Sequence, residues 1–445
     1  MADLIHKKRS LTSFQIIILG FAGVILVGAL LLMLPISTKS GTVTPFNEAL
    51  FTSTSAVCVT GLVVQDTATY WSAFGQSVIL VLIQIGGLGV ITVAASFALL
   101  SGRKISLMQR STMQEAIAAP KVGGIVRLTF FVLKVTFLVE LLGALVMMPT
   151  FIHDFGAKGI WMSFFHSISA FCNAGFDVMG TEGAKFASIT SYLGNPVINV
   201  TVMLLIVIGG IGFLTWEDIC TNKHHFNRYR MQSKVIIVTS GLLILIPAIF
   251  FFLVDFADMP MKERVLGSLF QSVTPRTAGF NTANLTAMTD AGQAIIIVLM
   301  LIGGSPGSTA GGMKTTTFAI LLATAFSTFR RKEDTQIFKR RVDYGVVRNA
   351  ATILMMYIIL FFGGAMVISV AEGLPFSTCL YETASAIGTV GLTLGITPKL
   401  GTLSHCVLMA LMFFGRVGGL TLIYAALSGT GKKLSKLPQE RITVG

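Results

Sequence analysis

The chain has 445 residues, of which 53% are hydrophobic and only 12% are charged. Soluble domains carry roughly twice that share of charged residues, so the composition excludes a soluble protein and indicates one that crosses the membrane several times. The net charge of +13 does not require nucleic acid as a partner, because the basic residues follow the pattern of membrane topology described below.

Eight apolar runs are each long enough to supply the ~20 residues with which a helix crosses a bilayer. They begin near residues 14, 78, 128, 197, 235, 294, 351 and 405. The first run is too long for a signal peptide and no small-residue cleavage site follows it, so we expect a retained span. If the N-terminus is cytoplasmic, 23 Lys and Arg fall on inner segments and only seven on outer ones. The positive-inside rule therefore predicts that both termini are cytoplasmic.

Four shorter, half-apolar segments lie between these runs. At about a dozen residues each they cannot cross the membrane and are typical of re-entrant helices. Each leads into a glycine, and a Ser–Ala pair precedes this glycine in every copy except the third. The segments occupy residues 46–57, 160–171, 264–275 and 375–387, and they lead into Gly61, Gly175, Gly279 and Gly391.

A second glycine lies in each of the apolar runs that follow, at Gly86, Gly209, Gly303 or Gly415. Four matched pairs in the same order predict an internal repeat, and repeats that keep the same sense surround an axis along the membrane normal. We therefore expect an all-α polytopic membrane protein. Four helix–pore-helix–helix units, with eight transmembrane helices and four re-entrant pore helices, would surround a central pore. The expected repeats are residues 1–104, 105–223, 224–340 and 341–445.

The strands that end at the four glycines are the candidate ion-binding sites. Non-helical backbone at membrane depth must line water or protein, and four strands around one axis can offer rings of carbonyl oxygens to a cation. Such strands need residues with positive φ, which glycine adopts readily. The C-terminal ends of the short helices would add partial negative charge. The candidate residues are Cys58, Val59, Thr60, Gly61, Cys172, Asn173, Ala174, Gly175, Arg276, Thr277, Ala278, Gly279, Gly388, Thr389, Val390 and Gly391.

Other interpretations of these glycines and cysteines are less consistent with the pattern. Cys58 and Cys172 occupy matching positions, but Arg276 and Gly388 fill the other two, so we do not expect a thiolate metal site. Close helix packing also favours glycine, and we prefer this explanation for the glycine pairs in the second and fourth apolar runs.

The stretch GGSPGSTAGG interrupts the apolar run that begins near residue 294. Glycine and proline disfavour a helix interior by ~1 and ~3 kcal/mol relative to alanine, so we expect a loop within the membrane. A deformable loop below a pore is a candidate gate, and a static kink is the alternative. The residues concerned are Gly303, Gly304, Ser305, Pro306, Gly307, Ser308, Thr309, Ala310, Gly311 and Gly312.

Arg416 stands where the other three copies have glycine. We expect it to form a positive barrier that touches the gate loop, and a structural pair with a buried carboxylate is the alternative. Arg276 is expected to form a structural pair, with Glu382 or Glu48 as candidate partners.

Three further charged residues lie within predicted spans. Lys314 is expected to extend towards the inner surface. Lys134 and Glu140 share one span, and the sequence assigns no role to either.

The motifs VCVTG, FCNAG, PRTAG and GTVG resemble the strands of the Trk/Ktr/HKT superfamily of cation transporters, and most closely those of the bacterial Ktr potassium-uptake membrane subunit. The resemblance covers essentially the whole chain and implies a transport protein in a bacterial plasma membrane, not an enzyme. Some sodium-carrying relatives have serine at the first strand glycine, so Gly61 implies selectivity for K+. Sodium stays possible as an activator or minor permeant ion, and no organic cofactor is expected.

Partners also follow from the resemblance, which implies a homodimer above a cytosolic nucleotide-binding ring of the RCK type (KtrA-like). No nucleotide-binding fingerprint occurs in this chain, so nucleotide control has to come from another chain. The basic segments 329–348 and 431–445 are candidate docking surfaces, with attraction to membrane lipid as the alternative. A sodium-conducting member of the superfamily and an alternating-access cation carrier are the two alternatives to a potassium pore.

Overall fold

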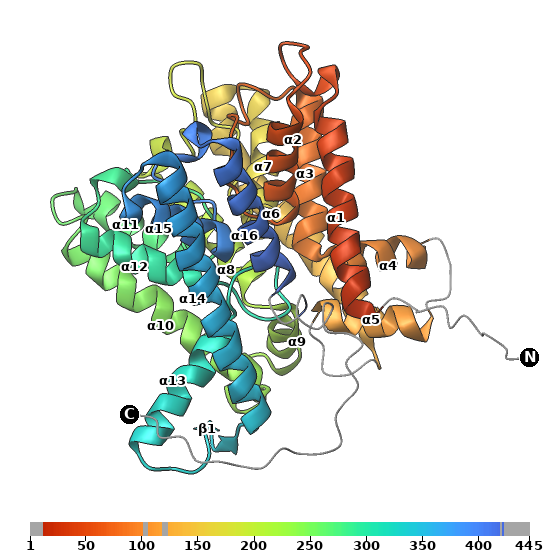
Figure 1. The fold of residues 1–445 in the computed structure, drawn as a ribbon, viewed down its shortest axis with the longest axis vertical. Coiled ribbons are helices and arrows are strands. Elements are labelled where there is room, and N and C mark those ends of the chain that lie inside the picture. The colour runs from red at the N-terminus through yellow and green to blue at the C-terminus, as the bar shows by residue number, and fades with distance from the viewer. Residues whose placement is uncertain (1–11, 101–105, 118–122, 419–420, 422–445) are drawn as a thin grey trace, which may run out of the picture.

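The computed structural model describes residues 12–100, 106–117, 123–418 and 421. Almost all regular structure in these residues is α-helical, and one short antiparallel hairpin joins two of the helices (Figure 1). The mostly helical fold expected from the sequence is confirmed. The predicted docking segment 431–445 and the basic start of the chain lie outside the described residues.

The helices form four groups, each with a long helix, a short helix and a further apolar helix. In chain order they are α1 (Ser13–Leu32), α2 (Phe46–Val57), α3 (Ala73–Leu88), α4 (Val90–Leu100), α5 (Leu107–Ile117), α6 (Ile125–Phe155), α7 (Lys158–Phe171), α8 (Pro196–Gly210), α9 (Phe213–Asn222), α10 (Met231–Leu253), α11 (Met261–Val273), α12 (Asp290–Leu301), α13 (Thr315–Phe329), α14 (Tyr344–Glu372), α15 (Phe376–Gly388) and α16 (Thr402–Val417). The hairpin, β1 (Gln336–Ile337) and β2 (Arg340–Arg341), lies between α13 and α14.

Local sequence signals explain where several helices begin. Ser72, Asn195 and Thr289 cap α3, α8 and α12, because each side chain accepts a hydrogen bond from a backbone N–H of the first turn. A proline stands directly before α2, α11 and α15, where its missing N–H removes no helical hydrogen bond.

Four helices, α1, α6, α10 and α14, are long and apolar enough to cross a membrane. The pairs α3–α4 and α8–α9 pass the same test together, but they bend by 97° and 99° at Gly89 and Gly212, which both have positive φ. The described residues thus contain four spanning helices, or six if each bent pair is one span. The expected eight spans are met only in part, because a loop divides α12 from α13 and α16 is short.

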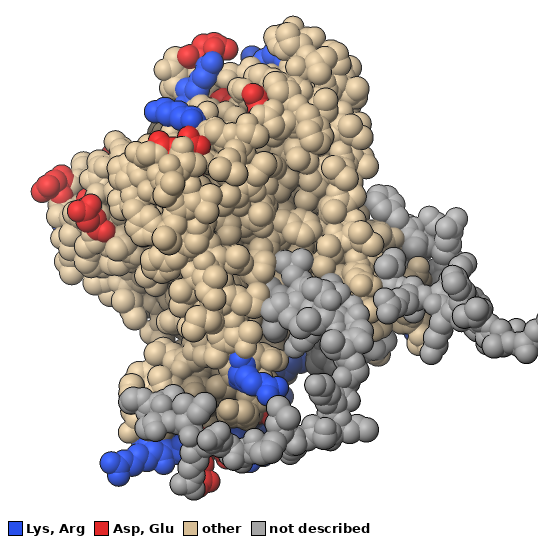
Figure 2. Space-filling view, viewed as in Figure 1, with Lys and Arg blue, Asp and Glu red and all other residues tan. Residues whose placement is uncertain are grey.

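The surface is consistent with a membrane protein. On the face shown in Figure 2, the acidic and basic side chains lie in the upper part and at the lower end. The broad region between them carries no coloured side chain, as expected where lipid surrounds the protein.

The groups of helices pack in a closed ring. α3 contacts α7, α8 contacts α11, α12 contacts α15, and α16 returns to α2. Within each of the four groups the long helix also contacts both of the helices that follow it, as α1 does with α2 and α3. Most residues of the short helices α2, α7, α11 and α15 are buried. The ring therefore brings the four short helices together in its interior.

One glycine contact recurs within the groups. Gly28 of α1 faces Ser53 of α2 and Leu82 of α3, and a Cβ on this glycine would lie 2.7 Å from a methyl carbon of Leu82. Gly143 of α6 faces a serine of α7 and a leucine of α8 in the same way, with a matching distance of 2.8 Å. The missing side chain lets the three helices approach closely.

Replacing Gly28 by alanine should lower the thermal stability of the detergent-solubilised protein. The added Cβ overpacks the contact of α1 with α2 and α3, for which a loss of about 1–3 kcal/mol is expected. Gly23→Ala is the matched control on the same helix, because nothing lies within 4 Å of its Cβ position. A melting temperature of Gly28→Ala equal to that of Gly23→Ala would contradict this packing.

Candidate ion pathway

A serine or threonine near the end of each short helix holds the strand that follows. In the first copy Thr60 N donates to Ser55 O at 2.8 Å, and Gly61 N donates to Ser55 Oγ at 3.1 Å. The serines of the second and fourth copies accept the same backbone bond, and in the third copy the carbonyl of Thr274 accepts from the strand instead. The Ser–Ala pairs of the sequence thus mark the turn from helix to strand.

Each strand contains two residues with left-handed backbone. The glycine is one of them, with φ of 91° at Gly61, 67° at Gly175, 77° at Gly279 and 95° at Gly391. The residue two positions earlier is the other, with φ of 57° at Val59, 59° at Asn173, 80° at Thr277 and 52° at Thr389. Such conformations outside glycine carry of order 1–3 kcal/mol of strain each, so the surroundings must impose them. Sequence reasoning missed this second position, because Val59, Thr277 and Thr389 are of types that rarely adopt positive φ and only Asn173 is of a type that favours it.

The four strand glycines lie in contact around a closed ring. A Cβ on Gly61 would lie 3.2 Å from the Cα of Gly175, and one on Gly175 would lie 3.0 Å from that of Gly279. A Cβ on Gly279 would likewise lie 3.2 Å from the Cα of Gly391. One on Gly391 would lie 3.0 Å from the Cα of Gly61, which closes the ring. Each added Cβ would also collide with a carbonyl oxygen of the neighbouring strand. Space and backbone conformation therefore both require glycine here.

All sixteen candidate residues of the strands are buried. A cavity of about 300 Å³ lies on the side of the loops that follow the strands, and we call it the outer cavity. All four strand glycines line it, together with Asp66, Asp177 and Lys399. The ring of glycines is thus accessible from this cavity.

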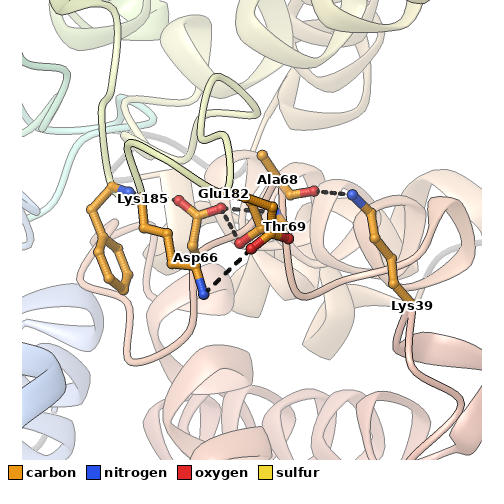
Figure 3. A network of polar contacts seen from close by, with 7 residues as sticks. Lys39, Asp66, Ala68, Thr69, Glu182 and Lys185 are labelled. Atoms are coloured by element: carbon orange, nitrogen blue, oxygen red, sulfur yellow. Dashed lines mark hydrogen bonds and ion pairs between the residues drawn. The ribbon is translucent and has the colours of Figure 1, made fainter.

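Asp66 fixes two of the loops around the outer cavity (Figure 3). Its Oδ1 accepts hydrogen bonds from the N–H and the hydroxyl of Thr69, at 2.8 and 2.9 Å. Its Oδ2 accepts from the N–H of Phe186 at 2.7 Å, which joins the loop after the second strand to the loop after the first. Nearby, Lys39 Nζ donates to Ala68 O at 2.6 Å. These bonds hold the wall of the cavity in one shape.

The loop that joins α12 to α13 is folded against other groups of the ring. Ser305 N donates to Gly210 O at 2.9 Å, and Thr309 N donates to Gly209 O at 3.2 Å. Gly312 N donates to a carbonyl of α16 at 3.2 Å. The predicted gate loop therefore lies between the ends of α8 and α16, and its backbone groups are satisfied there.

Arg416 lies between this loop and the first group of helices. Its guanidinium donates to Thr309 O and Gly86 O, and it donates to Gly87 O at 3.0 Å. None of the ion pairs found in the described part of the chain includes Arg416. Its contacts there are backbone carbonyls, not the carboxylate of the alternative hypothesis.

The structure corrects the expected partners of Arg276. Its guanidinium donates to the hydroxyl and carbonyl oxygens of Ser240 on α10, at 3.0 and 3.5 Å. Glu48 accepts instead from Gln65 at 2.9 Å, and Glu382 accepts from two threonines. The expectation was wrong because neutral donors of their own loops already satisfy both carboxylates.

Lys314 also differs from its expected position. Its Nζ donates to two carbonyls of the gate loop, at 2.8 and 3.3 Å, so the side chain turns to the loop and not to the inner surface. Glu140 is buried and accepts from Gln84 Nε2 at 3.0 Å, and the thiol of Cys172 lies 3.5 Å from Gln84 Oε1. Lys134 is exposed on the same helix.

Comparison with known proteins identifies the family. Residues 4–432 match the sequence profile of TrkH, described as a cation transport protein. The chain belongs to the TrkH family. The resemblance drawn from the four strand motifs is therefore confirmed, and the family is one of transport proteins and not of enzymes.

Relatives match the chain over nearly its whole length. The potassium/sodium uptake protein NtpJ of Enterococcus hirae is 38% identical, over 99% of this chain and 100% of that protein. The Ktr system potassium uptake protein B of Bacillus subtilis is 36% identical, over 95% of each. The crystal structure of the potassium transporter TrkH from Vibrio parahaemolyticus matches with a TM-score of 0.74 at 19% identity, over 96% of this chain and 86% of that one. This last likeness concerns the fold alone.

Cation uptake by this TrkH-family chain should depend on external pH through Asp177, which lies in a loop outside the spanning helices. The pKa of this carboxyl is raised to about 7, chiefly by burial and also by the charge of Asp66, while a hydrogen bond from Met179 N–H lowers it. The raised pKa means that the negative charge is present above about pH 7 and lost below it. The negative charge of Asp177 would attract a cation in the outer cavity by ~1 kcal/mol. We therefore expect uptake to fall about fivefold as the external pH drops below about 7.

The measurement is ion uptake against external pH for the wild type and for Asp177→Asn. The variant should transport at the reduced rate at every pH. A pH profile that is unchanged by the substitution would exclude Asp177 as the titrating group.

Proposed function

We propose that this member of the TrkH family takes up potassium through a pore formed by its four strands. The observation that carries the proposal is the closed ring in which Gly61, Gly175, Gly279 and Gly391 each touch the next. Side chains have no space in this ring, so the groups available to an ion are main-chain oxygens. The names of the relatives from E. hirae and B. subtilis, which are potassium uptake proteins, support the choice of ion.

The carbonyl oxygens of residues 58–61, 172–175, 276–279 and 388–391 would replace water around K+. Two left-handed residues in each strand support this function, because they reorient the backbone within a few residues. The C-terminal ends of the four short helices precede the strands, and their partial negative charge favours a cation. Asp66 and Asp177 would attract cations into the outer cavity before they reach the ring.

We propose the four repeats 1–104, 105–223, 224–340 and 341–445 as the structural units, with eight spans and four re-entrant helices in all. The cyclic packing of α3, α8, α12 and α16 on the next short helix supports this arrangement. The recurrent contact of Gly28 and Gly143 supports it independently. The distribution of basic residues favours cytoplasmic termini in a bacterial plasma membrane.

The gate in this proposal consists of loop 303–312 and Arg416. The loop lies against the ends of α8 and α16, and Arg416 adds a positive charge whose contacts in the described chain are backbone carbonyls. A cation would meet both obstacles below the ring of glycines. Opening requires that the hydrogen bonds of Ser305, Thr309 and Gly312 to their neighbours break.

We propose that control comes from a partner, because the B. subtilis relative is named as one protein of a Ktr system. The partner would be a cytosolic, nucleotide-binding subunit of the RCK type (KtrA-like), beneath a homodimer of this chain. The ends of α13 and α14 and the hairpin between them project at the lower end of the molecule (Figure 1). This projection contains the exposed basic segment 329–348, which is the docking surface of the proposal.

Sodium conduction is the second candidate function. The observation in its favour is that the E. hirae relative is named a potassium/sodium uptake protein. The ring of four glycines favours potassium, and sodium would then act as an activator or a minor permeant ion.

Flux into proteoliposomes tests the choice of ion, with potassium, rubidium and sodium supplied in turn. We expect potassium flux to exceed sodium flux, and Gly61→Ser should reduce this ratio about fivefold or more, because serine is strained by at least ~1 kcal/mol at positive φ. Gly41→Ser is the matched control, because Gly41 also has positive φ, at 70°, but lies in open space away from the ring. Equal ratios for Gly61→Ser and the wild type would remove the ring from the ion pathway.

Arg416→Ser should raise basal flux, because it removes a positive charge below the ring. If the charge of Arg416 contributes ~1.4 kcal/mol to the barrier for ion passage, its removal should raise the flux about tenfold. Lys134→Ser controls for the loss of a charge on an exposed position of α6 and should leave the flux unchanged. A folded Arg416→Ser protein that is no leakier than Lys134→Ser would show that Arg416 is not a barrier.

A further inference from the structure

Thr309 connects the gate loop directly to the second strand and its helix. Its hydroxyl donates to the carbonyl of Phe171, the last residue of α7, at 2.9 Å. The same hydroxyl accepts a hydrogen bond from Nδ2 of Asn173 at 2.9 Å. The backbone of Thr309 makes the separate bonds to Gly209 and Arg416. The side chain of Thr309 therefore contacts the end of α7 and the second strand, and its main chain contacts α8 and Arg416.

Asn173 depends on this contact. It is the left-handed residue of the second strand, with φ of 59°. Its Nδ2 bonds to Thr309, and its Oδ1 is buried with no hydrogen-bond partner among the described residues. If the loop moves away, the whole amide loses its partner while it stays buried, which is unfavourable. The balance of interactions at the second strand therefore changes when the loop leaves.

The matching residues of the other strands lack this bond. Val59 has no polar side-chain atom, and the buried hydroxyls of Thr277 and Thr389 have no partner among the described residues. Gly311 of the loop lies against Thr389, but this is a packing contact. Within the described chain, the second strand is the one whose left-handed residue is hydrogen-bonded to the gate loop.

We propose that Asn173 and Thr309 are positioning residues that couple the gate loop to the filter, so that the discrimination between K+ and Na+ depends on the position of the loop. The inference rests on the proposed function, because it needs the strands to be the ion filter. Coupling between two sites is reciprocal, so ions bound at the second strand also shift the equilibrium of the loop.

The test measures potassium and sodium flux in proteoliposomes for variants of both residues. Thr309→Val removes the hydroxyl, and with it the bonds to Asn173 and to Phe171 O, at nearly constant shape, and it keeps the main-chain bonds to Gly209 and Arg416. Thr309→Ser keeps the hydroxyl. Asn173→Gly removes the amide and still permits positive φ, so it breaks the same bond from the other side. The matched control is Thr315→Val, because Thr315 Oγ1 pairs with a hydroxyl of the same loop, Ser305 Oγ, at 3.0 Å.

We expect Thr309→Val to lower the potassium-over-sodium ratio about fivefold, the factor that corresponds to one net hydrogen bond. Thr309→Ser should retain the wild-type ratio, and Asn173→Gly should lower it as Thr309→Val does. The double variant should be no worse than Thr309→Val alone, since both single variants remove the bond between Asn173 and Thr309. Thr315→Val should retain the wild-type potassium-over-sodium ratio, and at most its basal flux should change.

Three results would overturn the coupling: a wild-type ratio in Thr309→Val, a double variant whose loss is the product of the single losses, or an equal loss in Thr315→Val. If Thr309→Val does not fold, Asn173→Gly decides by the same criterion. A wild-type protein that carries no potassium would refute the proposed function instead, so the two failures are distinguishable.

Discussion

Polar backbone groups that leave a helix within a membrane must find partners inside the protein, and the centre of this molecule is built around that requirement. Each strand is tied back to the serine or threonine of its own short helix. The gate loop donates its N–H groups to carbonyls of α8 and α16. Lys314 and Arg416 satisfy carbonyls that these interruptions leave free. The same groups that make the irregular backbone possible also determine its shape.

Three buried or half-buried cations show how this requirement changes the ordinary logic of ion pairs. Burial of a charge is costly unless it is paired or hydrogen-bonded, and a carboxylate is the partner usually sought. Here Arg276, Lys314 and Arg416 donate to carbonyl or hydroxyl oxygens. Carbonyls at the ends of interrupted helices carry partial negative charge, so they can hold a cation without a full opposite charge. The positive charge of Arg416 is therefore not neutralised by a carboxylate in the described chain.

The sequence predicted the helical fold, the four short helices and the glycines that the structure brings together. These features depend on local rules, namely apolar length and the conformational freedom of glycine, which a repeat makes visible. The left-handed residues at Val59 and Thr389 could not be predicted, because β-branched residues rarely adopt this conformation unless the surrounding structure imposes it. The partners of Arg276 were wrong for a related reason: sequence identifies opposite charges, but Ser240 is a neutral partner that only the packing of α10 brings near.

The closed order of contacts has a consequence for biosynthesis. The last helix of the described residues, α16, packs on the short helix α2 near the start of the chain. A nascent chain that ends before Gly391 leaves Gly61 without its neighbour on one side of the ring. The ring of four strand glycines is therefore complete only after translation has passed Gly391.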